Sequence, residues 1–300
     1  MIILVTIFGS YRKMKFKAAI LTEIKKPLEI TDLEVPELKS GQLLVKMFYS
    51  SICGTQINEI NGLKGKDKYL PHTLGHEGYG EVVDIAKGIS KVRVGDRVIV
   101  TWIKGRGLEC ENIKYGNINS GKACTLSEYS IVSENRIVPI SIPIELEKYA
   151  PLLGCCIPTG AGTVEHELSS SSKVLVLGLG GVGTAACIWA SLKCSDVYGY
   201  DILESRKNIL SIINIAGYNN NIVDHVIDTT GNIDGFRFGW ECLTRKGKLV
   251  VVGNPPKDIK FSYAQKLNIF KDISGKEYRL QNINSAISNW GKERKPIIKM

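Results

Sequence analysis

A chain of 300 residues with 44% hydrophobic content is long enough to bury a sizeable core, and its length favours two domains. The net charge of +9 comes from lysines scattered along the chain, without a dense basic block or interleaved aromatic residues, which argues against nucleic acid as a partner. Such a lysine-rich surface suits an anionic cofactor or substrate.

The eight cysteines are too dispersed for a disulfide scaffold, so we expect reduced thiols. Residues 1–8 are apolar but too short to span a bilayer, and the basic residues Arg12 and Lys13 follow this run, whereas a signal peptide needs them before it. We therefore expect a soluble, cytoplasmic protein that does not act on membranes. Met14 begins a more conventional start, which makes residues 1–13 either a translation-start artefact or a frayed extension.

Between Met14 and Pro139, short apolar or alternating runs punctuated by glycine and proline predict a compact, barrel-like β domain. The predicted strands are Lys17–Leu21, Gln42–Met47, Gly80–Ile85 and Arg97–Val100. The segment CGTQ at 53–56 directly follows one strand, and GHEG at 75–78 precedes another. Both segments are therefore expected at strand ends, where their side chains can converge.

Four serines, Ser169–Ser172, mark a linker into the stretch with the clearest signal. Val174–Leu177 is a run of four aliphatic residues and predicts a strand buried on both faces. Gly178, Gly180 and Gly183 follow in the pattern G-x-G-x-x-G, which permits a tight turn, close approach of backbone to a pyrophosphate, and close packing of the next helix. The N-terminus of that helix offers unpaired N–H groups to an anion.

A second predicted strand, Val197–Tyr200, ends in Asp201, whose carboxylate can accept hydrogen bonds from an adenosine ribose. An acid at this place favours NAD over NADP, although the nearby Arg206 leaves NADP open. Because strand, glycines, helix, strand and acid come in the required order, we interpret the stretch as a dinucleotide site, with a purely structural turn as the alternative. The expected cofactor-binding residues are Gly178, Gly180, Gly181, Val182, Gly183, Asp201 and Arg206.

Five segments in order, SICGTQ, LPHTLGHEGYGEVV, VRVGDRV, PLLGCCIPTGAGT and VLVLGLGGVG, resemble the zinc-dependent alcohol dehydrogenase branch of the medium-chain dehydrogenase/reductase family. The resemblance covers most of Met14 to Gly253 and resumes near the C-terminus. It implies an α/β protein with a GroES-like β-barrel catalytic domain in residues 14–168, completed by 276–300, and a doubly wound Rossmann NAD-binding domain in residues 169–275. It further implies a catalytic zinc in the cleft between the domains and assembly as a homo-oligomer, a dimer or tetramer.

By motif position, the resemblance makes Cys53, His76 and Cys155 the zinc ligands. Two thiolates and one imidazole suit a catalytic zinc, whose fourth position stays open for water or a substrate oxygen. Taken singly, each residue also reads as a buried or hydrogen-bonded structural residue. Thr55 matches the family's hydroxyl that receives the substrate proton, with strand-end capping as its structural alternative, and Glu77 is either an acid that contacts a ligand or an alternative ligand.

Two departures from the family pattern affect the metal. Many relatives have aspartate where Gln56 stands, and Gln56 is expected to accept a hydrogen bond from the ligand histidine through its carbonyl while holding zinc more weakly. In the lobe Trp102–Cys124, where relatives often bind a structural zinc with four cysteines, only Cys110 and Cys124 remain. We therefore expect at most one zinc per subunit, the catalytic one.

The C-terminal half is shorter than in relatives. After a predicted helix over Leu203–Ala216, the chain has only six residues, 217–222, where relatives have a strand and a helix, so the Rossmann sheet is expected to lack its third, edge strand. A second shortening follows Asp272–Gly275, after which Asn282–Trp290 predicts a helix and Pro296–Met300 a final strand.

The leading interpretation is a zinc- and NAD-dependent dehydrogenase that interconverts an alcohol or polyol and a carbonyl compound. The alternative from another class is a degenerate relative that binds nucleotide or zinc without turnover, destabilised by the two deletions. A zinc-free quinone or enone reductase is disfavoured, because Cys53, His76 and Cys155 would then have no reason to coincide. The sequence does not identify the substrate.

Overall fold

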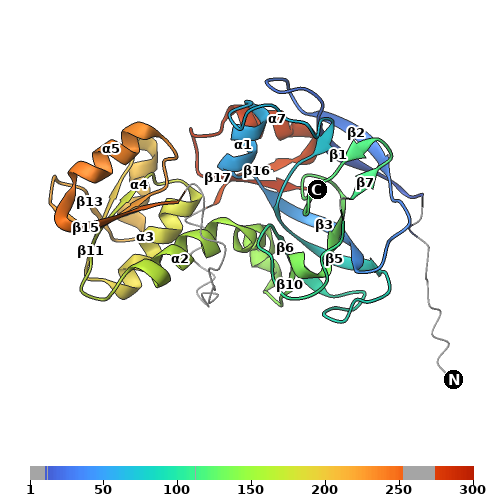
Figure 1. Cartoon of the computed structure of the whole chain (residues 1–300), viewed down its shortest axis with the longest axis horizontal. Helices are drawn as coiled ribbons and strands as arrows, with labels where there is room; N and C mark the ends of the chain where they lie inside the picture. Colours follow the sequence, from blue (N-terminus) through green and yellow to red (C-terminus); the bar gives the residue numbers. More distant parts are fainter. Residues whose placement is uncertain (1–10, 12, 112, 253–273) are drawn as a thin grey trace. The chain divides into compact units, whose positions relative to one another are not determined.

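The computed structural model describes residue 11 and residues 13–111, 113–252 and 274–300. The interpretation of residues 1–13 as an artefact or extension thus falls almost wholly outside the described residues. The described residues divide into two compact units (Figure 1). The first comprises those up to Gly154 with Glu277–Ser288 and Ile297–Met300, and the second those of Cys155–Lys276 with Asn289–Pro296.

Short strands make up most of the first unit. They are β1 (Lys15–Leu21), β2 (Glu29–Glu34), β3 (Gln42–Ser51), β4 (His72–Thr73), β5 (Glu77–Ile85), β6 (Arg97–Thr101), β7 (Lys114–Tyr115), β8 (Ile118–Asn119), β9 (Tyr129–Ser133), β10 (Ile137–Pro139), β16 (Ser274–Arg279) and β17 (Lys295–Lys299), of which the last two begin in residues of the second unit. The helices are α1 (Gly54–Ile60), α7 (Ile283–Ser288) and the 3-10 helices η1 (Glu134–Arg136), η2 (Ile144–Gly154) and η3 (Leu280–Asn282). All four strands predicted before Pro139 are confirmed, in β1, β3, β5 and β6.

Strand β3 is the centre of the first unit. One sheet has the order β10-β6-β5-β3-β17-β16, with β9 also paired to β3, and the other has the order β2-β1-β4-β8-β7. Leu43, Val45 and Met47 of β3 belong to one hydrophobic cluster, whereas Leu44 belongs to another. Because side chains alternate along a strand, β3 is buried on both faces and forms a fixed base for whatever follows its end.

The second unit is a parallel sheet with helices. Its strands are β11 (Lys173–Leu177), β12 (Asp196–Tyr200), β13 (Ala216–Gly217), β14 (Val223–Asp228) and β15 (Leu243–Val251), and its helices are α2 (Cys156–Glu167), α3 (Gly181–Lys193), α4 (Glu204–Ile212) and α5 (Ile233–Glu241). The strand order β13-β12-β11-β14-β15 reads 3-2-1-4-5 in chain order, which is the doubly wound arrangement. The α/β fold class expected from the sequence is thereby confirmed.

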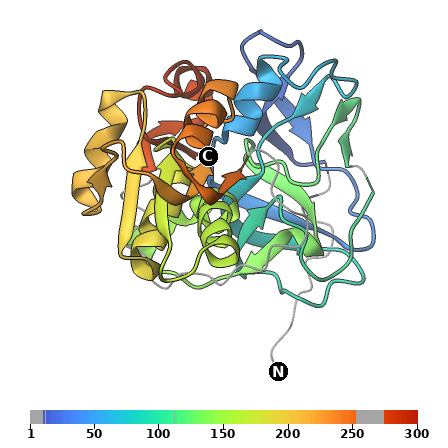
Figure 2. The ribbon, with the colours of Figure 1, turned by 60° about the vertical axis from the view of Figure 1, so that its left-hand side comes forward.

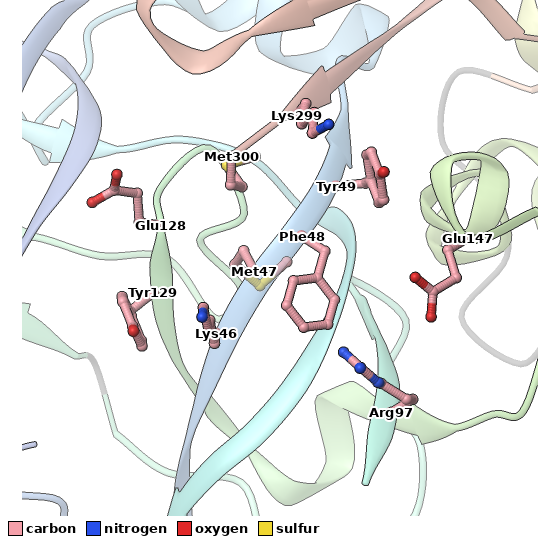
Figure 3. A pocket seen from close by; sticks show the side chains of 10 residues that line it. All are labelled: Lys46, Met47, Phe48, Tyr49, Arg97, Glu128, Tyr129, Glu147, Lys299 and Met300. Atoms are coloured by element: carbon pink, nitrogen blue, oxygen red, sulfur yellow. The ribbon is translucent and has the colours of Figure 1, made fainter. Parts of the chain in front are cut away.

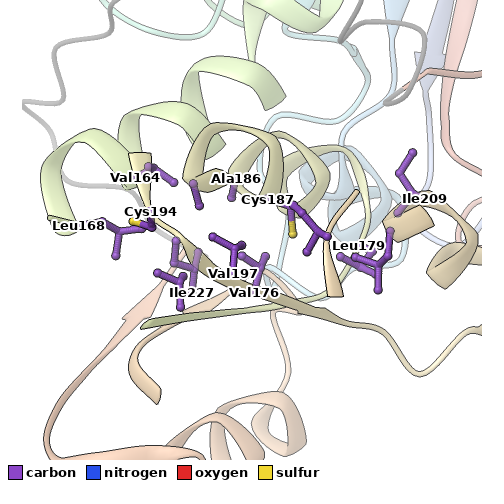
Figure 4. Packing of buried hydrophobic residues seen from close by; sticks show 14 residues of the cluster. Val164, Leu168, Val176, Leu179, Ala186, Cys187, Cys194, Val197, Ile209 and Ile227 are labelled. Atoms are coloured by element: carbon purple, nitrogen blue, oxygen red, sulfur yellow. The ribbon is translucent and has the colours of Figure 1, made fainter. Parts of the chain in front are cut away.

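A core of aliphatic and thiol side chains holds the helices to this sheet. Figure 4 shows Val164 and Leu168 from α2 and its end, Ala186 and Cys187 from α3, and Ile227 from β14 in one cluster. Helices α2 and α3 lie side by side in both views of the ribbon (Figures 1 and 2). This packing places α2 in the second unit, whereas the predicted domain boundary at residue 168 assigned it to the first. The functional domain limits remain a prediction.

The edge of the sheet beyond β12 is reduced to two residues. Ala216 and Gly217 pair with Tyr198 and Gly199, and the chain then reaches β14 through residues 218–222 without a helix. The expected loss of the third strand is thus nearly complete. At the other shortened place, the described chain runs from β16 through η3 and α7 directly to β17, so the final helix and strand agree with the prediction.

Candidate functional site

The strand pairing of the first unit brings Cys53 and His76 together. Strands β3 and β5 are antiparallel, and Ser50 pairs with Gly78 near the end of β3. Cys53 lies just beyond β3 as the N-cap residue of α1, and His76 lies just before β5. Because antiparallel partners run in opposite directions, a residue after one strand and a residue before the other meet at the same edge.

Cys155 is held close to Cys53 and His76 by the packing of Gly154, the residue before it. The Thr101 hydroxyl donates to the carbonyl of Gly154 over 2.6 Å, and Gly154 packs so tightly that a Cβ added there would lie 2.9 Å from Glu77 Cα. The next residue therefore starts beside Glu77. One ligand atom from each of Cys53, His76, Glu77 and Cys155 lies within 4.8 Å of the others.

These atoms fit a zinc ion. Nε2 of His76 is buried and has no hydrogen-bond partner among the described residues, although a buried polar atom normally has one. Beside it are two sulfur atoms and a carboxylate, which is the donor set that zinc prefers in proteins. A cation bound here satisfies the imidazole nitrogen and lets both thiols ionise.

Gln56 contacts two of these residues, and its carbonyl is used differently from the sequence expectation. Its Oε1 accepts a hydrogen bond from the backbone N–H of Cys53 over 2.7 Å, and its Nε2 lies 2.5 Å from Nδ1 of His76. The expectation that the carbonyl accepts from the histidine was therefore wrong, because the N-cap of α1 already occupies that oxygen. Gln56 is buried, so both contacts are shielded from water.

Thr55 and Glu77 flank the group in different surroundings. Thr55 is in the first turn of α1, exposed, and its hydroxyl makes no hydrogen bond to the rest of the described chain. Glu77 is fully buried at the start of β5, where its backbone N–H donates to the Thr125 hydroxyl and its carbonyl accepts from the Ser50 hydroxyl. These bonds hold the backbone of β5 directly after His76.

In the second unit, the glycine-rich segment makes the expected turn into α3. Gly178 has φ +86°, a conformation that favours glycine, and a Cβ added to Gly183 would lie 1.7 Å from the carbonyl oxygen of Gly178. No side chain caps α3 at Gly180, so the N–H groups at its start remain available to a ligand. The turn thus has the geometry that the fingerprint predicts for a pyrophosphate site.

Asp201 and Arg206 lie beside this turn. The Asp201 carboxylate is 4% exposed and accepts hydrogen bonds from the backbone N–H groups of Leu179 and Leu203, at 2.7 and 2.9 Å. Nη1 of Arg206 lies 3.5 Å from this carboxylate and close to Gly180. Oδ2 accepts from the N–H of Leu179 and from Nη1 of Arg206, whereas Oδ1 accepts from the N–H of Leu203 and keeps a lone pair for a further donor.

Sequence reasoning missed Lys295. Its side chain is 5% exposed, and a Cβ added to Gly181 would lie 2.7 Å from its Cδ, so the lysine stem covers the start of α3. The ammonium lies 6.0 Å from the ring centroid of Trp290. A positive charge held near a helix N-terminus adds to its attraction for phosphate. The glycine pattern could not reveal this residue, which comes from a distant part of the chain.

A cavity of about 560 Å³ in the first unit contains none of the predicted site residues. In Figure 3, Phe48 of β3 points toward Arg97 of β6, whose guanidinium lies 4.3 Å from the ring centroid. Cationic and acidic side chains, Lys46, Glu128 and Glu147 among them, surround the opening.

A second group of potential metal ligands comprises Glu59, Asp67 and His72, and both ring nitrogens of its histidine have hydrogen-bond partners. Nε2 of His72 lies 2.8 Å from Asp67, and its Nδ1 lies 2.9 Å from the carbonyl of Thr73. The described residues bring neither Cys110 nor Cys124 into either potential ligand group.

No helix in the described ranges is long and apolar enough to cross a membrane.

Comparison with known proteins agrees with this architecture. The alcohol dehydrogenase GroES-like domain matches residues 39–142. The chain is 29% identical over 266 residues to an alcohol dehydrogenase of Geobacillus stearothermophilus, covering 81% of this chain and 78% of the relative. It is 28% identical over 290 residues to an S-(hydroxymethyl)glutathione dehydrogenase of a Synechocystis strain, covering 80% and 78%.

Solved structures share the fold over nearly the whole chain. Benzyl alcohol dehydrogenase from Acinetobacter calcoaceticus superposes with a TM-score of 0.79 at 21% identity, covering 95% of this chain and 99% of that one. A cobalt- and zinc-bound alcohol dehydrogenase from Pyrobaculum aerophilum superposes with a TM-score of 0.74 at 19% identity, covering 95% and 100%.

A doubly wound sheet with an open helix N-terminus, together with a β unit that gathers thiols and an imidazole, defines a metal-dependent dinucleotide oxidoreductase. These likenesses support the zinc-dependent alcohol dehydrogenase branch of the medium-chain dehydrogenase/reductase family as the family that this chain resembles. The likeness implies zinc and a nicotinamide cofactor.

Proposed function

We propose that the protein is a zinc- and NAD-dependent dehydrogenase that transfers a hydride between an alcohol or polyol and the nicotinamide ring. The observation that carries this proposal is the gathering of Cys53, His76 and Cys155 donor atoms within 4.8 Å, with an imidazole nitrogen that has no hydrogen-bond partner in the described parts of the chain. When bound, zinc polarises the substrate oxygen, and the nicotinamide accepts or gives the hydride.

The proposed roles of the surrounding residues follow from their positions. Cys53, His76 and Cys155 hold the metal, and Thr55 moves the alcohol proton through its exposed hydroxyl. Glu77 adds a carboxylate to the ligand group, where it stabilises the cation or replaces a ligand during exchange. A small alcohol or carbonyl compound is the proposed partner.

Two measurements on purified protein test this function. Metal analysis is expected to give one zinc per chain, and a screen of alcohols and sugar alcohols with NAD is expected to produce NADH absorbance. Zinc and NADH binding without any turnover across the screen would instead support the degenerate relative.

Asp201 supports NAD as the cofactor. Its buried carboxylate lies beside the glycine turn and keeps acceptor capacity for ribose hydroxyls, and its charge repels a 2′-phosphate. Asp201→Gly with Arg206 retained is expected to move the kcat/KM ratio toward NADP, because it removes the acceptor and the repulsion while leaving a cation. An unchanged ratio would show that Asp201 does not contact the ribose.

Assembly as a homodimer or homotetramer and a cytoplasmic location are proposed from the family resemblance. Sedimentation velocity of the purified protein tests the assembly directly.

A further inference from the structure

We propose that Gln56 is a positioning residue that sets the tautomer of His76 and thereby opposes zinc binding until its amide turns over. The inference deepens the proposed function and rests on its assignment of His76 as a zinc ligand. It follows from two hydrogen bonds that the Gln56 side chain makes at once.

The first hydrogen bond fixes which end of the amide faces which neighbour. A backbone N–H can only donate, so the atom that faces Cys53 N at 2.7 Å must be the carbonyl oxygen of Gln56. Oxygen and nitrogen of a side-chain amide are assigned from such partners. The NH2 group of Gln56 is thereby directed at Nδ1 of His76, 2.5 Å away.

The second hydrogen bond fixes the histidine. An amide NH2 has only donors to offer, so Nδ1 of His76 must accept with its lone pair. A neutral imidazole that accepts at Nδ1 carries its proton on Nε2. Zinc needs the lone pair of Nε2, the buried ring nitrogen that has no hydrogen-bond partner among the described residues. The hydrogen bonds that cap α1 therefore favour the tautomer in which the proton of His76 must leave Nε2 before that nitrogen can bind the metal.

Zinc binding then requires two linked changes. The imidazole proton moves from Nε2 to Nδ1, and the Gln56 amide turns over so that its oxygen accepts from Nδ1–H. The turned amide no longer accepts from Cys53 N–H, so a donor next to another ligand loses its partner. A carboxylate has two acceptor oxygens and can satisfy both donors without turning.

Gln56→Glu has the same shape and supplies those two oxygens. We expect it to bind zinc about 10- to 100-fold more tightly than the natural chain, the usual size of an effect from a residue that orients a histidine ligand. Asn58→Glu is the matched control, because it adds the same charge to an exposed position of the same helix without reaching His76. Zinc affinity is measured by competition with a chromophoric chelator.

Nitrogen-15 chemical shifts of the histidine rings test the tautomer without any metal. The chain has only four histidines, and a His76→Asn spectrum identifies the signals of His76. We expect the proton on Nε2 in the natural chain and on Nδ1 in Gln56→Glu. A merely structural role of Gln56 would leave the tautomer unchanged.

Two results would overturn the inference: a natural chain that already carries the proton on Nδ1, or a Gln56→Glu gain no larger than that of Asn58→Glu. If neither the natural chain nor Gln56→Glu binds zinc, the ligand assignment of the proposed function fails, and the zinc part of this inference fails with it. The tautomer measured on apoprotein tells the two failures apart.

Discussion

Thr55 is the nearest hydroxyl in the ligand motif that is not itself engaged. It follows Cys53 by two residues in the first turn of α1, is exposed, and has no hydrogen-bond partner among the described residues. A hydroxyl both donates and accepts, so it can pass a proton from an alcohol to another acceptor. A purely structural threonine at a helix start would more commonly use its hydroxyl on the backbone.

Replacing Thr55 separates a proton relay from a structural role. Thr55→Ala is expected to lower kcat by about 10² to 10⁴-fold, the usual contribution of general acid-base catalysis, while Thr55→Ser retains most activity. Zinc content is expected to stay unchanged in both, because the hydroxyl is not a ligand. Equal activities of the alanine and serine variants would assign the proton to another path.

For single residues, the sequence could predict which ones form the candidate site but not the direction of their hydrogen bonds. Cys53 and His76 were recognisable because each stands in a distinctive motif at a strand end. The contacts of Gln56 could not be predicted, because an amide offers both a donor and an acceptor. The N–H of Cys53, which competes for the amide oxygen, is brought next to it only by the formation of α1.

Among the elements, η1 contains Glu134, whose buried carboxylate accepts hydrogen bonds from two other segments of the chain. Glu134 accepts hydrogen bonds from the backbone N–H groups of Ser90, Lys91 and Leu108, at 2.7, 2.8 and 3.2 Å. Burial alone raises the pKa of Glu134, but these hydrogen bonds outweigh it and leave the pKa below its ordinary value. The carboxylate therefore stabilises the fold above its unfolded pKa of about 4.3 and loses that effect as pH falls through the lower folded value.

Glu134→Gln is expected to lower the free energy of unfolding by about 1–3 kcal/mol at pH 7, since it replaces an acceptor oxygen by a donor opposite N–H groups. The difference from the natural chain is expected to shrink at about pH 3.5, below the unfolded pKa, where the natural carboxyl also begins to protonate. Urea unfolding at pH 7 and at about pH 3.5 measures this difference in the free energy of unfolding. The exposed Glu145→Gln serves as control, and a loss that does not depend on pH would contradict the account.

The elements were predictable where pattern and length agree, as in β11, α3 and β12. The edge strand of the Rossmann sheet was harder to predict. The helix predicted to reach Ala216 ends at Ile212, and Ala216 and Gly217 pair with β12 as a two-residue edge strand. Such a two-residue pairing depends on the neighbouring strand and leaves no hydrophobic period in the sequence.

For the whole molecule, the length favoured two domains, and the family resemblance implied the doubly wound strand order that the second unit has. It could not show from local pattern that Cys155 lies with Cys53 and His76. That expectation came from the family resemblance, and the contact of Gly154 with Glu77 now gives it a structural basis.

The proposed function depends above all on zinc held by His76 together with the thiols of Cys53 and Cys155. Metal analysis of purified His76→Ala, beside the natural chain and the exposed His166→Ala as control, tests this most directly. We expect one zinc per chain in the natural protein and in His166→Ala, and little zinc with no alcohol-dependent NADH formation in His76→Ala, because two thiolates leave the ion under-coordinated. A His76→Ala protein with a full equivalent of zinc and unchanged turnover would contradict the account.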